Sequence, residues 1–200
     1  GQLRFYMSDL DATQVKDKII AQLEILARVR LEMGVDIRVR CLACTKTFAH
    51  IIRACPDFAE LCHRAGMERF GFGVDGTKFT WKEIGKPHNN EIEIAEVFTY
   101  CQQGDLQAEA LLVVGSRAES LASLLRLHCD AARYALKYGA DIRPHVYKPI
   151  PGGNEWGEDG YFVSQVLNNR DLLYSLDFTA CASRWTHPNT YLRWAVNTTF

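Results

Sequence analysis

The 200-residue sequence contains no apolar run of about 18 residues, the length that a helix needs to cross a bilayer. Its first residues, GQLRFYMSD, lack the basic and apolar regions of a secretory signal peptide. It also lacks an excess of either charge, since its net charge is −1. A nearly neutral chain has no general attraction for nucleic acid or for a membrane surface. The composition, with 48% hydrophobic and 24% charged residues, is that of a soluble globular protein.

The seven cysteines are odd in number and lie in apolar or helical contexts, which favours free thiols over a disulfide framework. We therefore expect a cytoplasmic protein. Cys41 and Cys44 form a CxxC pair, which could bind zinc or carry out redox chemistry. Neither a second CxxC nor an HxxxH pair accompanies them, so the pattern favours two small core residues over a metal site.

Apolar periodicity alternates along the chain between strand-like and helix-like spacing. It predicts strands at 3–7, 35–41, 69–74, 109–114 and 140–147, and helices at 13–33, 48–64 (broken near Pro56), 90–103 and 119–138. Strands that alternate with helices predict an α/β fold with a parallel sheet and right-handed crossovers. Residues 152–160 (GGNEWGEDG) resemble a linker, so we expect one domain at 1–153 and a helical or irregular extension at 154–200.

The run RFGFGVDGTKFTWKEIGKPHN (residues 69–89) combines a buried strand, an acid followed by glycine, and a polar segment that leads into a helix. Ligands bind at the carboxyl ends of parallel strands. Asp75 at such an end is therefore a candidate binding residue, although an Asp-Gly pair can also serve only as a turn. The other strand-end candidates are Ser8, Asp9, Arg40, Gly115 and Lys148.

Motifs at four strand ends resemble motifs that follow one another in the same order in one known family. GVDG (73–76) followed by IGKPH (84–88) resembles GVESG followed by INKGH, and VVGSRAES (113–120) resembles IVGFPGET. KPIPGG (148–153) resembles TPYPGT, and MSDLD (7–11) resembles an acid-rich turn such as LDD. Over residues 3 to about 153 the chain thus resembles the radical S-adenosylmethionine (radical SAM) superfamily. This resemblance implies a partial (β/α) TIM-like barrel, open at its N-terminal edge.

The resemblance also implies a set of roles around S-adenosylmethionine (SAM). Asp75, next to Gly73, matches the acid that accepts hydrogen bonds from the ribose hydroxyls. Ser8 or Asp9 would lie near the methionine amino group, and Arg40 would meet the methionine carboxylate or a substrate acid. Val113 and Gly115 would line the adenine. Lys148 completes the set of expected cofactor-binding residues, and the resemblance leaves the catalytic residues unassigned.

The family's CxxxCxxC motif, which holds a [4Fe–4S] cluster, occurs nowhere in these 200 residues. We expect the motif to lie upstream in a longer parent protein rather than to have been lost. The parent would cleave SAM reductively to a 5′-deoxyadenosyl radical that abstracts hydrogen from an unknown substrate. This chain alone would then hold no cluster and be inactive.

Two alternatives remain open. Residues 3–13 (LRFYMSDLDAT) fit the strand-DxDxT pattern of haloacid-dehalogenase-type phosphatases, with Asp9 as nucleophile, Asp11 as general acid and Mg²⁺ on the phosphate. Ser116 and either Lys137 or Lys148 could supply that family's later motifs, but the late acidic strand end that completes its metal site is missing. Alternatively, the chain is a non-catalytic (βα) module. Its exposed edge strands, 3–7 and 142–147, could pair to form a homo-oligomer.

Overall fold

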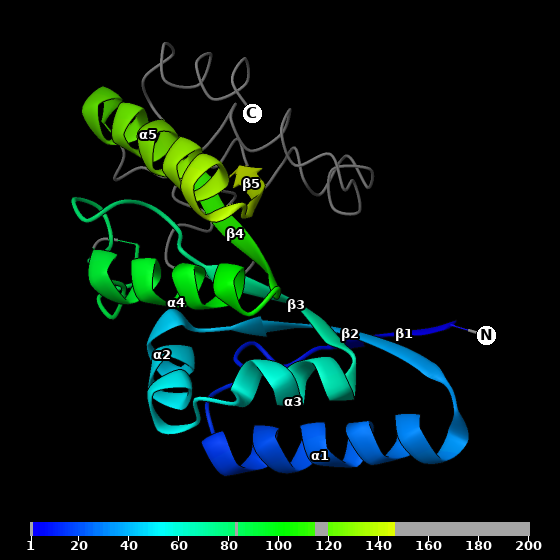
Figure 1. Cartoon of the computed structure of the whole chain (residues 1–200). Coiled ribbons are helices and arrows are strands. Elements are labelled where there is room, and N and C mark those ends of the chain that lie inside the picture. Colours follow the sequence, from blue (N-terminus) through cyan, green and yellow to red (C-terminus); the bar gives the residue numbers. More distant parts are fainter. Residues whose placement is uncertain (1, 83, 115–119, 147–200) are drawn as a thin grey trace, which may run out of the picture.

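A computed structural model describes residues 2–82, 84–114 and 120–146, and for 145–146 only the backbone. The five strands and five helices of this part follow one another in the order β1, α1, β2, α2, α3, β3, α4, β4, α5, β5 (Figure 1). Their bounds are β1 Gln2–Met7, α1 Lys16–Met33, β2 Asp36–Ala43, α2 Thr45–Ala54, α3 Phe58–Ala65, β3 Met67–Gly73, α4 Glu91–Gln103, β4 Gln107–Val114, α5 Leu121–Tyr138 and β5 Asp141–Val146.

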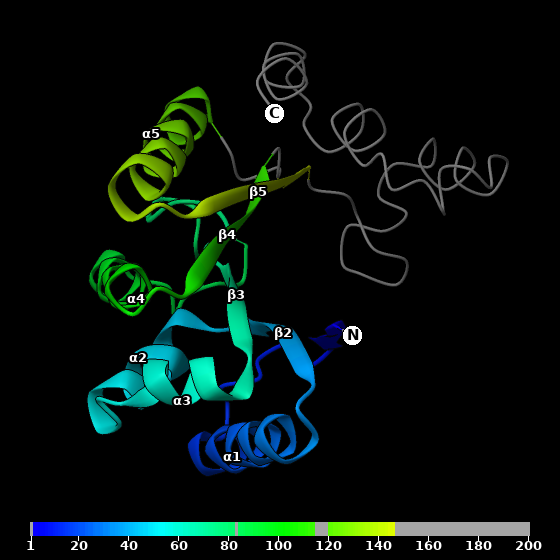
Figure 2. The same cartoon turned by 45° about the vertical axis from the view of Figure 1, so that its right-hand side comes forward.

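The five strands form one parallel sheet in the sequential order β1-β2-β3-β4-β5. Figure 2 shows the described helices gathered on one side of this sheet, so its other face carries none of them. A doubly wound sheet would instead reverse its strand order at a switch point. Sequential order with helices on one side is the arrangement of a partial (β/α) barrel. The predicted fold class is therefore confirmed, and β1 and β5 are the edge strands of the described sheet.

Glycine and proline mark the predicted helix ends. Gly34, Gly66 and Gly139 follow α1, α3 and α5 with φ of 61°, 78° and 65°, the left-handed conformation that ends a helix. Pro56 lies in the break between α2 and α3. Several boundaries differ from expectation by a few residues, and two of them affect the candidate site. Helix α1 starts at Lys16, after a turn held by Asp11, and β2 continues past Cys41 to Ala43.

The core lies between the sheet and the helices. In β2 the residues Ile37, Val39, Cys41 and Ala43 are buried and alternate with half-buried polar or apolar residues. On the same side of the sheet, the ring of Phe48 from α2 lies 5.0 Å from Phe70 and 5.1 Å from Phe72. It also packs 5.6 Å from Phe58 of α3, all in edge-on geometry. One aromatic cluster therefore joins α2, α3 and β3.

The described cysteines are free thiols, and three of them, Cys41, Cys62 and Cys101, are buried in this core. Burial raises the pKa of Cys41 to about 12 and also raises the pKa of Cys62 and Cys101. Cys41 therefore packs as a neutral core residue, as the sequence favoured. No helix of the described part is long and apolar enough to span a membrane. The expected linker and the 154–200 extension lie outside the described residues.

Candidate cofactor-binding edge

Parallel strands end at the same edge of the sheet, and several predicted residues lie along this carboxyl edge. Ser8 and Asp9 follow β1, Asp75 follows β3, and Val113 stands one residue before the end of β4. Gly115 and Lys148 lie outside the described residues. Arg40 is not at this edge, because β2 runs three residues beyond it. Its expected place at a strand end is therefore wrong. It belongs to the face of the sheet that carries none of the described helices, which we call the helix-free face.

Asp75 is 8% exposed, and its Oδ2 lies 3.1 Å from Lys86 Nζ. The preceding residue Val74 donates its amide to Leu111 O at 3.1 Å, which fixes this end of β3 against β4. A Cβ at Gly73 would stand 3.5 Å from both Asp75 Oδ2 and Lys86 Nζ. The ion pair thus lies directly over the bare backbone of Gly73, at van der Waals distance from where a side chain would begin.

The loop between β3 and α4 returns Lys86 to Gly73 through local hydrogen bonds. Thr77 N donates to Thr80 Oγ1 at 2.9 Å, and Thr80 N donates back to Thr77 O at 2.9 Å. Lys86 N then donates to Trp81 O at 2.7 Å. These bonds close two successive turns, so residues distant from Asp75 in sequence come back to it in space.

Asn89 completes this group. It is 5% exposed, and its Nδ2 donates to Gly73 O at 3.3 Å, while its Oδ1 has no hydrogen-bond partner. Because the Gly73 carbonyl can only accept, the amide orientation is set by this bond. A buried carbonyl oxygen without a partner costs about 1–3 kcal/mol, so the site favours a ligand or water that donates there. The next residue, Asn90, caps α4 by accepting from Glu93 N at 2.7 Å.

We define Gly73, Asp75, Lys86 and Asn89 as the Gly73 site. Sequence reasoning identified the first two and missed the functional potential of Lys86 and Asn89. Lys86 stands in IGKPH (84–88), the segment before α4 that already carried a family resemblance, and Asn89 follows it directly. That segment was a usable signal, whereas the ion pair and the unpartnered amide oxygen depend on how the loop folds.

The turn after β1 carries two acids with different surroundings. Asp11 accepts hydrogen bonds from Thr13 N at 3.0 Å, Cys44 N at 3.1 Å and Thr47 Oγ1 at 2.9 Å. It therefore ties this turn to the start of α2. Asp9 has a half-exposed side chain and lies 3.9 Å from Lys18 Nζ. Ser8 and Asp9 line an open cavity of about 540 Å³ whose described walls come from residues 8–18 alone.

Arg40 points from β2 to a buried acid on the helix-free face. Its Nε donates to Glu109 Oε2 at 2.7 Å, and Arg69 Nη1 donates to Glu109 Oε1 at 3.0 Å. Arg143 Nε lies 3.5 Å from the same Oε1. Burial alone would raise the pKa of Glu109, but the hydrogen bonds and charges of Arg40 and Arg69 outweigh it and lower that pKa.

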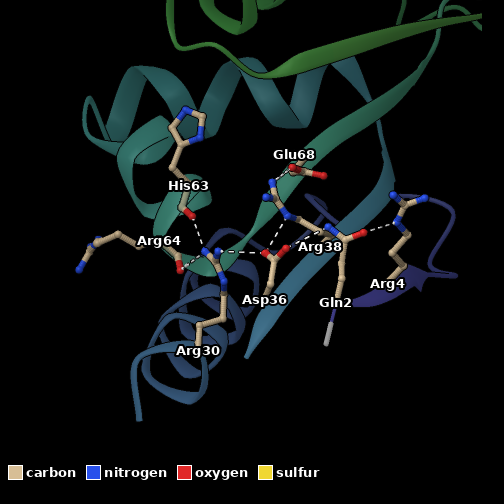
Figure 3. A network of polar contacts seen from close by, with 8 residues as sticks. All are labelled: Gln2, Arg4, Arg30, Asp36, Arg38, His63, Arg64 and Glu68. Atoms are coloured by element: carbon tan, nitrogen blue, oxygen red, sulfur yellow. Dashed lines mark hydrogen bonds and ion pairs between the residues drawn. The ribbon is translucent and has the colours of Figure 1, made fainter. Parts of the chain in front are cut away.

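A separate polar network lies at the opposite, amino end of the strands (Figure 3). Asp36 of β2 accepts from Gln2 Nε2 at 2.9 Å and from Arg38 Nε at 2.8 Å. Arg30 of α1 lies 3.6 Å from Asp36 and donates to His63 O at 2.7 Å. This network joins α1, α3 and the first strands. Since it lies at the end of the sheet opposite the carboxyl edge, we assign it to stability.

Comparison with known proteins places the fold. No protein-family model matches the sequence, and no curated protein matches it. Two solved structures of the radical S-adenosylmethionine methyltransferase TsrM from Kitasatospora setae match the fold at 16% identity, with TM-scores of 0.54 and 0.53. One contains cobalamin and a [4Fe-4S] cluster, and the other contains tryptophan and the SAM analogue aza-SAM. HemN from Escherichia coli, a coproporphyrinogen III oxidase and radical SAM enzyme, aligns at 11% identity with a TM-score of 0.47.

The alignments cover 71% and 70% of this chain but only 27% and 26% of the TsrM chains, and 75% of this chain against 44% of HemN. The chain therefore spans about a quarter of the TsrM length. The comparison establishes the fold: the sheet and its helices have the architecture found in radical SAM enzymes. The superfamily resemblance found in the sequence is confirmed at that level.

The two cofactors that the sequence resemblance implies fit these residues differently. A [4Fe–4S] cluster does not fit, because no CxxxCxxC is present in the sequence and no three potential ligands gather at one point in the described part. SAM fits the Gly73 site better. Its ribose hydroxyls need acceptors, and the site offers the Asp75 carboxylate and the unpartnered Asn89 Oδ1.

Proposed function

We propose that this chain forms the SAM-binding part of a radical SAM enzyme. The observation that carries the proposal is the Gly73 site. A buried acid, a paired lysine and an amide oxygen in need of a donor surround one glycine at the carboxyl edge of a sheet with the radical SAM fold. In such sheets that edge is where ligands bind.

Each proposed role follows from the chemistry of the side chain. Asp75 accepts hydrogen bonds from the ribose hydroxyls, and Lys86 forms an ion pair with its carboxylate. Asn89 accepts a further hydrogen bond through Oδ1. The bare backbone at Gly73 gives the nucleoside room, and half-buried Val113 offers the adenine an apolar contact. Ser8 or Asp9 meets the methionine amino group, and Gly115 and Lys148 remain proposed contacts outside the described residues.

The cluster ligands would come from sequence outside these 200 residues, where we propose a CxxxCxxC segment. In radical SAM enzymes SAM supplies a 5′-deoxyadenosyl radical that abstracts a hydrogen atom from the substrate. The residues of this chain would bind and orient SAM for that chemistry, and the chain alone would be inactive. We also propose a cytoplasmic location, in line with its free thiols.

The phosphatase alternative is less well supported. Its general acid would be Asp11, but the carboxylate of Asp11 already accepts hydrogen bonds from the backbone of Thr13 and Cys44 and from Thr47. A carboxylate held in this way is suited to fixing a turn, because donors of the chain itself already occupy both of its oxygens. A Mg²⁺-dependent hydrolysis of p-nitrophenyl phosphate that Asp9→Asn abolishes would favour the phosphatase.

The first prediction concerns SAM binding to the 200-residue chain, followed through the backbone amide signals in NMR spectra. We expect SAM to shift the signals around residues 73–76 and 86–90. We also expect Asp75→Asn to weaken binding at least about tenfold, because hydrogen bonds to a charged group contribute about 1.5–3 kcal/mol. Asp17→Asn, which changes an acid with a fully solvated side chain on α1, should leave the affinity unchanged.

No response to millimolar SAM, or equal affinities for the Asp75 and Asp17 variants, would contradict the proposal. The cluster is tested separately. A longer chain that includes a CxxxCxxC segment, reconstituted with iron and sulfide and then reduced, should convert SAM to 5′-deoxyadenosine. A parent gene without such a segment would rule out this part of the proposal while leaving SAM binding open.

A further inference from the structure

The helix-free face of the sheet carries an unusual concentration of arginine. We define Arg40, Arg69 and Arg143, which surround Glu109, as the arginine cluster. They come from β2, β3 and β5, and Glu109 stands between them on β4. The Glu109 side chain is 2% exposed, whereas the three arginine side chains are 37–50% exposed. The acid is thus buried beneath three guanidinium groups that remain open to a ligand.

The cluster retains positive charge and unused donors. Three guanidinium groups face two carboxylates, Glu109 and Asp141, because Asp141 Oδ2 lies 3.3 Å from Arg69 Nη1 and 3.8 Å from Arg143 Nη2. The local balance is therefore one positive charge. Each guanidinium has five N–H donors, and the pairs within the cluster use only some of them. Glu109 holds the arginines in place, so an incoming anion would meet donors that are already oriented.

An apolar layer adjoins the cluster on the same face, toward the carboxyl edge. Alternation places Leu42 after Arg40, and Leu111 and then Val113 after Glu109. A Cβ at Gly71 would lie 2.9 Å from Leu42 Cδ2 and 3.2 Å from Leu111 Cδ1. The two leucines therefore converge over Gly71, next to Glu109. Since a strand rises about 3.3 Å per residue, the face changes from charged at Glu109 to apolar at Val113 over roughly 13 Å.

We propose that this face binds an elongated substrate with a carboxylate at one end and an apolar body. The carboxylate would bind the arginine cluster, and the body would lie along Leu42, Leu111 and Val113. The far end of such a molecule reaches the edge that holds the Gly73 site. A single local positive charge suits a carboxylate better than a phosphate monoester, which carries nearly two negative charges. The assignment of this molecule as the substrate rests on the proposed function. The prediction that it binds to this face does not depend on that function.

The test uses octanoate as the probe, with acetate, 1-octanol and octyl phosphate as comparisons, each titrated into the 200-residue chain and followed by NMR. Octanoate should shift amide signals at 40–43 and 109–113. Acetate lacks the apolar body and octanol lacks the charge, so both should bind at least about tenfold more weakly, the factor that 1.4 kcal/mol represents. Octyl phosphate binding more tightly than octanoate would overturn the carboxylate assignment.

Two variants separate the head group from the body. Arg143→Gln should weaken octanoate binding about tenfold, the factor of about 1.4 kcal/mol that one charged contact can supply. The control Arg4→Gln on β1, whose guanidinium Nε donates to the neighbouring Gln2, should have no effect. Leu111→Ala should weaken octanoate binding more than acetate binding. Octanoate affinities that are unchanged in Arg143→Gln, or a lack of octanoate binding, would overturn the inference.

The outcomes also distinguish this inference from the proposed function. If SAM binds and octanoate does not, only the substrate assignment fails. If octanoate binds and SAM does not, the arginine cluster remains an anion site and the radical SAM assignment fails. Arg143→Gln should leave SAM binding unchanged, because Arg143 is not among the residues proposed to bind SAM.

Discussion

Gly76 determines how the chain leaves Asp75. Its φ is 68°, in the left-handed region that residues with a side chain adopt at a cost. A Cβ there would also stand 2.5 Å from Ile84 Cδ1 and 2.6 Å from Thr80 Oγ1. The turn after Asp75 is therefore both conformationally demanding and crowded, and only glycine satisfies both conditions without movement of the Thr80 and Ile84 side chains.

Gly76→Ala should accordingly lower the free energy of unfolding more than Gly85→Ala. Gly85 has a similar φ of 74°, but nothing lies within 4 Å of a Cβ built on it, so it serves as a matched control for conformational strain alone. We expect a loss of about 1–2 kcal/mol for Gly85→Ala from the left-handed backbone, and at least about 1 kcal/mol more for Gly76→Ala from overpacking. Urea denaturation measures both, and equal losses would contradict the crowding argument.

At the scale of single residues, the sequence predicts the residues that directly follow a strand better than those that a loop brings back to the strand end. Asp75 and Gly73 were predictable because a strand, an acid and a glycine stand next to one another in sequence. The roles of Lys86 and Asn89 were not predictable. The positions of these two residues depend on hydrogen bonds within the loop, such as that from Lys86 N to Trp81 O. Arg40 was placed at a strand end because the strand pattern gave no sign that β2 continues to Ala43.

At the scale of elements, glycine and proline made the helices predictable. Gly34, Gly66 and Gly139 end α1, α3 and α5, and Pro56 separates α2 from α3. The start of α1 was less predictable. Hydrogen bonds of Asp11 hold residues 11–13 in a turn, and apolar spacing along the sequence does not separate this turn from the helix that follows. Which helices share one aromatic cluster depends on tertiary packing that periodicity does not encode.

Helix α2 is held by Phe48, whose ring contacts Phe58, Phe70 and Phe72 and is fully buried. Phe48→Ala should lower the free energy of unfolding by about 3–5 kcal/mol, because it removes a large core side chain and leaves a cavity. The control Phe79→Ala changes a ring that is 63% exposed and should stay within about 0.5 kcal/mol. A loss below about 1 kcal/mol for Phe48→Ala, measured by urea denaturation, would show that the cluster contributes little to stability.

At the scale of the whole molecule, the two faces of the sheet are stabilised by different forces. Burial of apolar side chains against the helices stabilises one face. On the helix-free face, Glu109 on β4 joins Arg40 of β2, Arg69 of β3 and Arg143 of β5, so one carboxylate links four strands. The parallel sheet was predictable from the alternation of strands and helices. The charged character of its open face follows from register across strands, which no local pattern reveals.

This linkage predicts how stability changes with acidity. The pKa of Glu109 is lowered from its ordinary value of 4.5, because the hydrogen bonds and charges of Arg40 and Arg69 outweigh the effect of burial. The ionised form is therefore favoured in the folded state. Its contribution is fully present above the unfolded pKa and is lost as the pH falls through the folded pKa. Below pH 4.5 the free energy of unfolding should thus fall as Glu109 becomes protonated.

Glu109→Gln tests the assignment, because glutamine keeps the shape of the side chain and cannot titrate. Its unfolding free energy, measured by urea denaturation at a series of acidic pH values, should decline less steeply than that of the unaltered chain. Glu24→Gln, on the exposed side of α1, is the control and should keep the original slope. Parallel curves for all three proteins would show that the ionisation of Glu109 contributes nothing to the stability of the sheet.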